Sequence, residues 1–128
     1  MHLLASSHIY NHMVVDGLTP AQSDRVFHAL ADRTRRDIVR RALLGEESVS
    51  ALGRRYPMSL TAVQKHVAVL EAAGLVSKTR RGREQVVRAD IGTLRRAMRL
   101  LDTLEALWRG RVDRMSALLS EPEDGDPK

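Results

Sequence analysis

Residues 58–76 read MSLTAVQKHVAVLEAAGLV and combine a helical spacing of apolar residues with an uneven distribution of polar ones. Serine, threonine, glutamine, lysine and histidine lie in the first half, and the second half is largely apolar up to a glycine. Val63, Val67 and Leu70 recur at the i, i+4 and i+7 spacing of a buried helix face. The stretch therefore predicts a packed helix whose hydrogen-bonding side chains gather at its N-terminal end.

Three further helices are predicted before this one. The four helix starts carry side chains that accept hydrogen bonds from a helix N-terminus: Thr19, Asp32, Ser48 and Ser59. Pro20 and Gln22 complete a capping box at the first start. The expected ends are marked by Gly45, Pro57 and Gly74. The residues expected to be buried in the first three helices are Val26, Phe27, Leu30, Ile38, Val39, Ala42, Leu43, Val49, Leu52 and Tyr56.

The sequence period changes from helical to alternating after the fourth helix. Residues 75–80 and 85–89 are predicted strands, and the glycine-centred turn at residues 81–84 predicts a β-hairpin. Asp90 is placed to cap a last helix over residues 91–119. The short connection between the third and fourth helices predicts a helix-turn-helix. The fold class is therefore mainly α with a small β-hairpin: a winged helix-turn-helix of about five helices, a two-stranded wing and a long C-terminal helix.

The 128 residues suffice for one domain. Residues 1–18 lack sustained periodicity and are expected to form a mobile N-terminal arm, in which Met13 is an alternative start. Residues 19–119 are the predicted folded domain, and residues 120–128 form a predicted disordered acidic tail. The formal net charge is +5, but residues 1–119 hold 20 basic and 12 acidic residues, a balance of +8. Such a basic body favours an anionic partner, most simply a nucleic acid, over charge that serves solubility alone.

Composition disfavours several other classes of protein. The chain has no cysteine, so disulfides and thiolate metal sites are not expected. It has no apolar run of about 18 residues, and its N-terminus does not resemble a secretory signal, so a cytoplasmic protein is expected. No serine, histidine and acid form a nucleophilic set and no glycine-rich phosphate loop occurs, so neither an enzyme nor a cofactor is expected.

Two motifs in order resemble the ArsR-type family of winged helix-turn-helix repressors. Residues 27–43, FHALADRTRRDIVRRAL, are similar to the family's opening signature "ALADPTRR", with Arg33 in place of the proline. Residues 48–76, SVSALGRRYPMSLTAVQKHVAVLEAAGLV, resemble its helix-turn-helix in the serine start, the KHV core and the EAAGLV exit. The resemblance covers residues 20–119. It implies a sequence-specific regulator that binds double-stranded DNA, a repressor or autorepressor, within the subgroup that lacks the family's metal sites.

In helix-turn-helix docking, the second helix enters the major groove with its N-terminal residues toward the base edges. Gln64 is suited to bidentate contact with adenine, and Lys65 to the acceptors of guanine or to phosphate. Thr61 offers a methyl group to thymine and a hydroxyl to phosphate, and Ala68 lies beside this face. Ser59 serves as the helix cap or contacts a phosphate. These five residues are the predicted DNA-binding residues of the helix.

Four cations surround the turn of the hairpin: Lys78, Arg80, Arg81 and Arg83. The winged family places this loop along the minor groove or flanking phosphates, which gives affinity and position with little sequence information. The alternative is a hairpin whose charges only aid solubility. Arg33, Arg35 and Arg36 are candidates for phosphate contact or for surface ion pairs. His66 lies next to the buried face and is expected to be packed or bonded to the backbone.

The last helix carries two apolar seams, more than a monomer of this size buries on one closing helix. One seam consists of Leu94, Met98, Leu101, Trp108, Val112, Met115 and Leu119. The other consists of Ala97, Leu100, Leu104 and Leu107, and these are the residues assigned to a dimer interface. The resemblance implies a symmetric homodimer formed through this helix. Two-fold symmetry would place the two reading helices ~34 Å apart on an inverted-repeat operator.

Some members of the family sense metals, but the ligands of both family sites are missing. Residues 47–55 have no cysteine, and residues 91–119 have no histidine. His8 and His12 are four residues apart, but no helix is predicted there, so no metal site is expected. The effector is left open. The competing class is a winged-helix module that binds protein or RNA without reading a DNA sequence.

Overall fold

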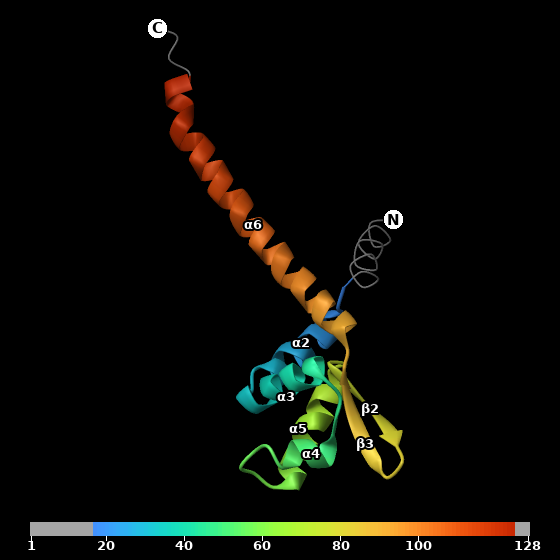
Figure 1. Ribbon diagram of the computed structural model, residues 1–128. Coiled ribbons are helices and arrows are strands. Elements are labelled where there is room, and N and C mark those ends of the chain that lie inside the picture. The colour runs from blue at the N-terminus through green and yellow to red at the C-terminus, as the bar shows by residue number, and fades with distance from the viewer. Residues whose placement is uncertain (1–16, 125–128) are drawn as a thin grey trace, which may run out of the picture. The chain divides into compact units, whose positions relative to one another are not determined.

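The computed structural model describes residues 17–124, which form a mainly helical structure with a small sheet (Figure 1). The elements in chain order are α2 (Pro20–Leu30), α3 (Arg33–Leu44), β1 (Glu47–Ser48), α4 (Val49–Gly53), α5 (Leu60–Ala72), β2 (Val76–Arg81), β3 (Glu84–Ala89) and α6 (Ile91–Asp124). The predicted fold class is confirmed, with α4 and α5 as the helix-turn-helix and β2 and β3 as the wing. The expected N-terminal arm lies outside the described residues except for Gly17 and Leu18, and Leu18 packs against the core.

The four predicted helix caps are confirmed. Thr19 N donates to Gln22 Oε1 at 2.8 Å and Gln22 N donates to Thr19 Oγ1 at 3.1 Å, which closes the capping box. The other caps each accept one backbone hydrogen bond: Asp32 from Arg35 at 3.0 Å, Ser48 from Ala51 at 3.0 Å and Ser59 from Ala62 at 3.1 Å. Each of these bonds satisfies a backbone donor that the helix leaves unpaired.

The sheet is antiparallel with the strand order β1-β3-β2. Arg81 pairs with Glu84 at the far end of the hairpin, so Gly82 and Arg83 alone form the turn. Gly82 has a φ of 66°, a left-handed conformation that glycine adopts without a steric cost. The sequence predicts a two-stranded wing and misses β1, because a two-residue strand is too short to show an alternating pattern.

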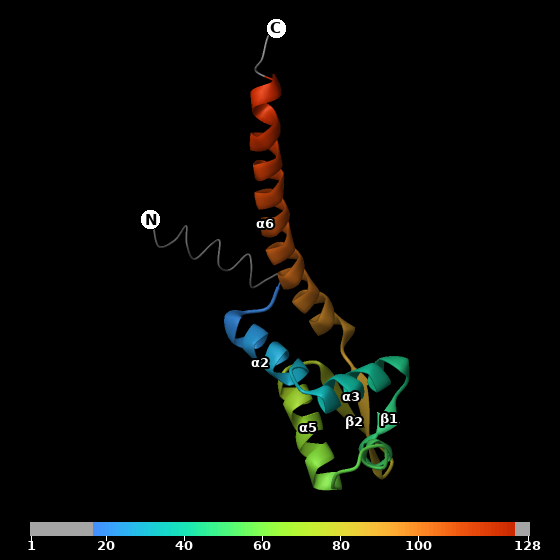
Figure 2. The same cartoon turned by 90° about the vertical axis from the view of Figure 1, so that its left-hand side faces the viewer.

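The core is formed by residues of α2, α3, α4, α5, β2, β3 and the first turns of α6. Figure 2 shows how α2, α3 and α5 are arranged beside β2. Its most deeply buried large side chains are Val26, Ile38, Leu52, Val63, Val67, Leu70, Leu75 and Val87. The buried face predicted for α5 is confirmed, because the exposed fractions of Val63, Val67 and Leu70 are 0%, 1% and 0%. Gly74, with a φ of 78°, ends this helix as predicted, and Leu75 N donates back to Leu70 O at 3.0 Å.

Two residues that the sequence assigns to the core are exposed. Phe27 is 37% exposed and Leu43 is 49% exposed. One residue step turns a helix by about 100°, and each of these residues is one step beyond the buried stripe of its helix. Gly45 ends α3 as predicted, but its φ of 173° is extended backbone rather than a left-handed cap.

Helix α6 starts as predicted, with Asp90 Oδ1 accepting from Gly92 N at 2.9 Å. It continues to Asp124, beyond the predicted end at residue 119. The prediction ends the helix where its apolar pattern ends, but a helix needs no apolar face to continue, and it does so here although Pro122 supplies no backbone donor. The described chain divides after Ala97 into two units. The division predicted from the sequence, into an arm, one domain and an acidic tail, stays a prediction.

Candidate nucleic-acid interface

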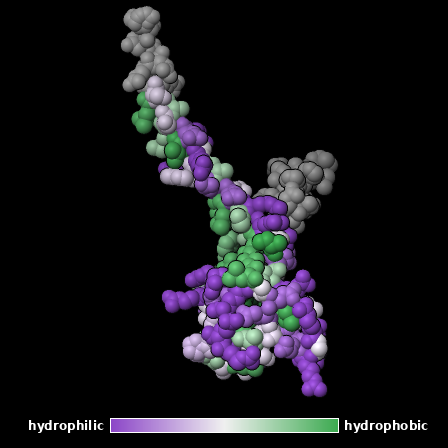
Figure 3. All heavy atoms as spheres, viewed as in Figure 1, coloured by the Kyte–Doolittle hydropathy of each residue, from purple (hydrophilic) through white to green (hydrophobic). Residues whose placement is uncertain are grey.

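Helix α5 presents the predicted polar face to solvent. The burial of its opposite face leaves four of the predicted residues exposed together: Thr61, Gln64, Lys65 and Ala68. Ser59 precedes this face, and its Oγ accepts the Ala62 backbone hydrogen bond, so its role as the cap is confirmed. Hydrophilic residues cover most of the visible surface around the helix-turn-helix and the wing (Figure 3). Contact of these residues with DNA stays a prediction.

The turn between α4 and α5 is tied to α3 by Tyr56. Because α4 ends at Gly53, Tyr56 lies beyond the helix in which the sequence predicts it. Its hydroxyl donates to Asp37 Oδ2 at 2.6 Å, and Arg40 and Arg41 each donate to the same carboxylate at 2.8 Å. The Arg41 guanidinium lies 6.0 Å from the centre of the Tyr56 ring. Since this turn sets where α5 begins, the cluster positions the exposed face of α5.

The same cluster shifts the pKa values of its members, including those of Asp37 and Tyr56. Hydrogen bonds from Tyr56 and from the two arginines hold the pKa of the Asp37 carboxyl well below its usual range. Burial, followed by the hydrogen bond to Asp37 and its negative charge, raises the pKa of Tyr56 to about 12. At neutral pH Asp37 is therefore ionised and Tyr56 is protonated, which is the state in which the hydroxyl donates.

His66 joins α5 to the end of α2 through Arg35. His66 Nδ1 lies 3.2 Å from Arg35 Nη1 and 3.9 Å from Asp32 Oδ2. Arg35 Nε and Nη2 donate to the carbonyl oxygens of Ala29 and His28 at 2.8 and 3.1 Å. His66 is half-buried, so the expected packing is confirmed, and its hydrogen-bond partner is a side chain rather than the backbone.

The arginines at the start of α3 fall into two groups. Arg36 Nη1 donates to the Leu30 carbonyl at 2.8 Å, and Arg35 makes the bonds just described. Both therefore lie at the C-terminal end of α2, where unpaired carbonyls and the negative end of the helix dipole favour a cation. Arg33 is exposed and forms no ion pair with any described residue, so it stays available for phosphate contact.

The four predicted wing cations are not equivalent. Lys78 Nζ lies 3.4 Å from Glu71 Oε1, and Arg81 Nη2 lies 3.0 Å from Glu46 Oε1. The other two form no ion pair within residues 17–124: Arg80 and Arg83. Among the described residues, these two arginines are therefore the wing cations without a carboxylate partner.

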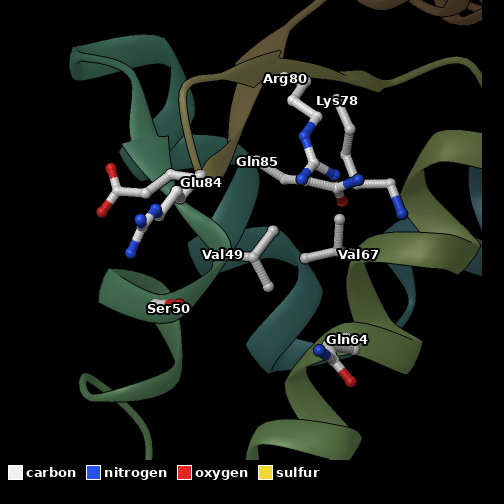
Figure 4. Close-up of a pocket in the computed structure, with 9 residues that line it drawn as sticks. Val49, Ser50, Gln64, Val67, Lys78, Arg80, Glu84 and Gln85 are labelled. Atoms are coloured by element: carbon white, nitrogen blue, oxygen red, sulfur yellow. The ribbon is translucent and has the colours of Figure 1, made fainter.

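A groove of about 460 Å³ lies between α4, α5 and the wing (Figure 4). The side chains of Val49 and Val67 lie between Gln64 on α5 and the two β2 cations, Lys78 and Arg80 (Figure 4). The predicted reading helix and the predicted wing therefore border one depression. Three polar residues of the lining are missed by the sequence: Ser50, Glu84 and Gln85. Gln85 carries no charge and so stands outside the basic pattern of the hairpin, but the strand register places it directly opposite Arg80.

No cluster of three or more histidine, cysteine, aspartate or glutamate side chains between residues 17 and 124 could hold a metal ion. His2, His8 and His12 lie outside this part of the chain. The described helices also include none that is long and apolar enough to cross a membrane.

No family model matches the chain, but individual relatives do. The HTH-type transcriptional regulator Rv2034 of Mycobacterium tuberculosis is 43% identical over 67 residues, which are 52% of this chain and 63% of that regulator. The chain thus matches less than two thirds of this relative's length. The uncharacterized HTH-type transcriptional regulator YuzN of Bacillus subtilis is 41% identical over 71 residues, 50% of this chain and 77% of YuzN.

Solved structures show the same architecture. An ArsR-like transcriptional regulator from Rhodococcus sp. RHA1 is 35% identical with a TM-score of 0.69, over 77% of this chain and 92% of that one. The homodimeric winged helix-turn-helix DNA-binding domain Mb0332 from Mycobacterium bovis is 28% identical with a TM-score of 0.53, over 70% and 80% of the two chains. The present chain belongs to the ArsR family of winged helix-turn-helix transcriptional regulators. The relatives named here are regulators of transcription, and Mb0332 is a DNA-binding domain.

Tyr56→Phe should lower the free energy of unfolding by about 1.5 kcal/mol at neutral pH, as expected for losing a hydrogen bond to a charged group that keeps other partners. Because the pKa of Tyr56 is raised in the folded protein, this stabilisation is present below about pH 10 and is lost as the pH approaches about 12. Urea unfolding across this range should show wild type and variant converging. A constant difference between them at every pH would contradict the assigned hydrogen bond.

Proposed function

We propose that the chain is a sequence-specific regulator that binds double-stranded DNA as a homodimer and represses transcription at an inverted-repeat operator. The observation that carries this proposal is one exposed face of α5 beside a groove bordered by the wing cations. Family membership supports DNA binding in general. Beyond this, we propose which residues read the bases, that a second copy of the chain is the partner, and that binding represses transcription.

The proposed reading element is the exposed face of α5. A helix with its side chains is about 10–12 Å across and fits a major groove about 12 Å wide. The opposite face of α5 is buried, so this is the side available to the bases. Gln64 offers the amide pair that matches adenine, and Lys65 a donor for guanine or phosphate. Thr61 and Ala68 present small groups suited to the methyl of thymine.

The proposed positioning element is the wing. With α5 in the major groove, the neighbouring DNA backbone passes over the groove between α5 and the hairpin. Arg80 and Arg83 have no carboxylate partner in the described chain, so they neutralise phosphates without first breaking an ion pair. Lys78 forms an ion pair with Glu71, so we expect it to contribute less to phosphate binding. Such contacts add affinity and fix orientation without reading bases.

The proposed partner is a second copy of the chain, bound along α6. The seam assigned to the dimer needs one correction, because Ala97 is 5% exposed and belongs to the core of its own chain. Of the remaining members, Leu100 is half-buried, Leu104 is 55% exposed and Leu107 is 67% exposed. Leu101 and Trp108 of the other seam are exposed to a similar degree, at 52% and 59%. Apolar exposure of this extent marks an interaction surface, so both seams enter the proposed interface.

Gln64→Ala should reduce affinity for the operator by about 1–3 kcal/mol and relax the preference at the base that Gln64 reads. Titrations against the operator and against duplexes with single base changes would measure this. Gln85→Ala is the matched control, since it removes an amide from the wing side of the same groove. If wild type bound operator and random duplex with equal affinity at several salt concentrations, sequence-specific reading would be wrong and a general protein or RNA module would be favoured.

Arg83→Ala should weaken binding to every duplex and flatten the dependence of log K on log salt by about 0.9. The reason is that an unpaired arginine at the wing turn neutralises about one phosphate. Affinity measured over a series of salt concentrations gives the slope. A loss of affinity at some sequences but not at others would show that Arg83 reads bases rather than phosphates.

Leu104→Glu should convert the dimer to a monomer, because it places a carboxylate in the proposed apolar interface. Sedimentation velocity over a concentration series measures the change. Leu44→Glu is the control, because Leu44 is 77% exposed at the end of α3, outside α6. A Leu104→Glu protein that remained dimeric, or a wild type that was monomeric, would remove α6 from the interface.

A further inference from the structure

Glu46, in the link between α3 and β1, engages two arginines of the wing with its two carboxylate oxygens. Its Oε1 lies 3.0 Å from Arg81 Nη2, and its Oε2 lies 2.8 Å from Arg88 Nε. One acid outside the hairpin thus holds one cation from β2 and one from β3. Glu46 is part of neither motif that carries the family resemblance.

The strand register explains why these two arginines share one carboxylate. Side chains alternate along a strand, and residues opposite each other in a ladder point to the same face. In the pairing of β2 with β3, Arg81 and Arg88 therefore lie on one face of the hairpin. Lys78 and Arg80 alternate onto the other face, where they line the groove beside α5. The hairpin thus separates its cations into a groove face and a face held by Glu46.

We propose that Glu46 withholds Arg81 from DNA and so limits the affinity of the wing for duplexes of any sequence. In the free protein the Glu46 carboxylate pairs with the guanidinium of Arg81, the group that would otherwise pair with a DNA phosphate. Arg81 can bind a DNA phosphate only after its ion pair with Glu46 breaks. Arg80 and Arg83 have no ion pair to break among the described residues. This inference rests on the proposed function, because it assumes that the wing lies along the DNA backbone.

Breaking the ion pair between Glu46 and Arg81 costs little free energy. The side chain of Arg81 is 63% exposed and that of Glu46 is 35% exposed, so their ion pair is screened by solvent and salt. Arg88 keeps the second carboxylate oxygen, and therefore Glu46 stays in place when Arg81 leaves. Phosphate contacts supply most of the affinity for non-specific DNA. A carboxylate that competes for one such contact consequently restrains binding to wrong sites.

A purely structural role for Glu46 predicts the opposite sign. If the two ion pairs mainly hold the hairpin in the orientation that fits DNA, removing them disorders the wing and lowers affinity. If Glu46 withholds Arg81, removing its charge releases a cation and raises affinity. The direction of the change therefore separates the two roles.

The test compares wild type with Glu46→Gln on a duplex of random sequence, by fluorescence anisotropy over a series of salt concentrations. Affinity should rise about two- to fivefold at low salt, in the range that an exposed ion pair is worth. The slope of log K against log salt should steepen by about 0.9, corresponding to one additional phosphate contact. Far-UV circular dichroism confirms that the variant is folded.

A double-mutant cycle identifies the arginine involved. In an Arg81→Gln background, Glu46→Gln should give no gain, whereas in an Arg88→Gln background the gain should persist. Asp24→Asn removes one exposed negative charge from α2, where it forms no ion pair with a described residue, and it should leave the salt slope unchanged. Should Glu46→Gln misfold, Arg81→Gln alone remains informative: it should change the wild-type salt slope far less than Arg83→Gln does.

The outcomes separate this inference from the proposed function. Lower or unchanged affinity in folded Glu46→Gln overturns the withholding role, and so does a gain that persists without Arg81. A single Arg81→Gln substitution that flattens the slope as much as Arg83→Gln also overturns it. Failure of wild type to bind any duplex overturns the proposed function itself.

Discussion

The packing of one face of α5 into the core is the interaction on which the rest of the structure depends. Val63, Val67 and Leu70 are almost fully removed from solvent, and each burial of this kind contributes about 1.5–3 kcal/mol. Because these residues occupy one side of the helix, the opposite side, with Gln64 and Lys65, faces solvent. Ser59 and Gly74 set where the helix begins and ends, and the Tyr56–Asp37 hydrogen bond fixes the turn that leads into it. The exposed face of α5 is therefore set by the packing of its opposite face into the core.

The positive charge of the chain is distributed by local pairs, so the net charge overstates what is available to DNA. Arg35 and Arg36 donate hydrogen bonds to backbone carbonyls at the end of α2, and Arg41 donates one to Asp37. In the wing, Arg80 and Arg83 form no ion pair with any described residue, and Glu46 holds Arg81 and Arg88. Phosphate contacts strengthen binding at every site alike. The balance between free and paired arginines is therefore expected to set the affinity for DNA of any sequence, and not the preference for one sequence over another.

Sequence reasoning succeeds here wherever the signal is local. Capping residues, the glycine stop at Gly74 and the period of α5 each involve neighbours along the chain, and the structure confirms them. It fails where the partner is distant. Glu46 is far from Arg81 in sequence, and nothing in the motif predicts their pairing. Ala97 fits the apolar seam of a long helix equally well whether its own core or a second copy covers it, and only packing shows that its own core does. The contact of the predicted DNA-binding residues with bases and phosphates stays a prediction, because it depends on a partner outside the chain.

The central claim is that α5 reads a DNA sequence in the frame set by a two-fold dimer. Selection of binding sites from a pool of random duplexes, followed by sequencing of the enriched pool, tests it most directly. The account predicts enrichment of an inverted repeat whose half-site centres are about one helical turn, ~34 Å, apart. A pool that stays random after repeated selection, although the protein retains duplex, would contradict it.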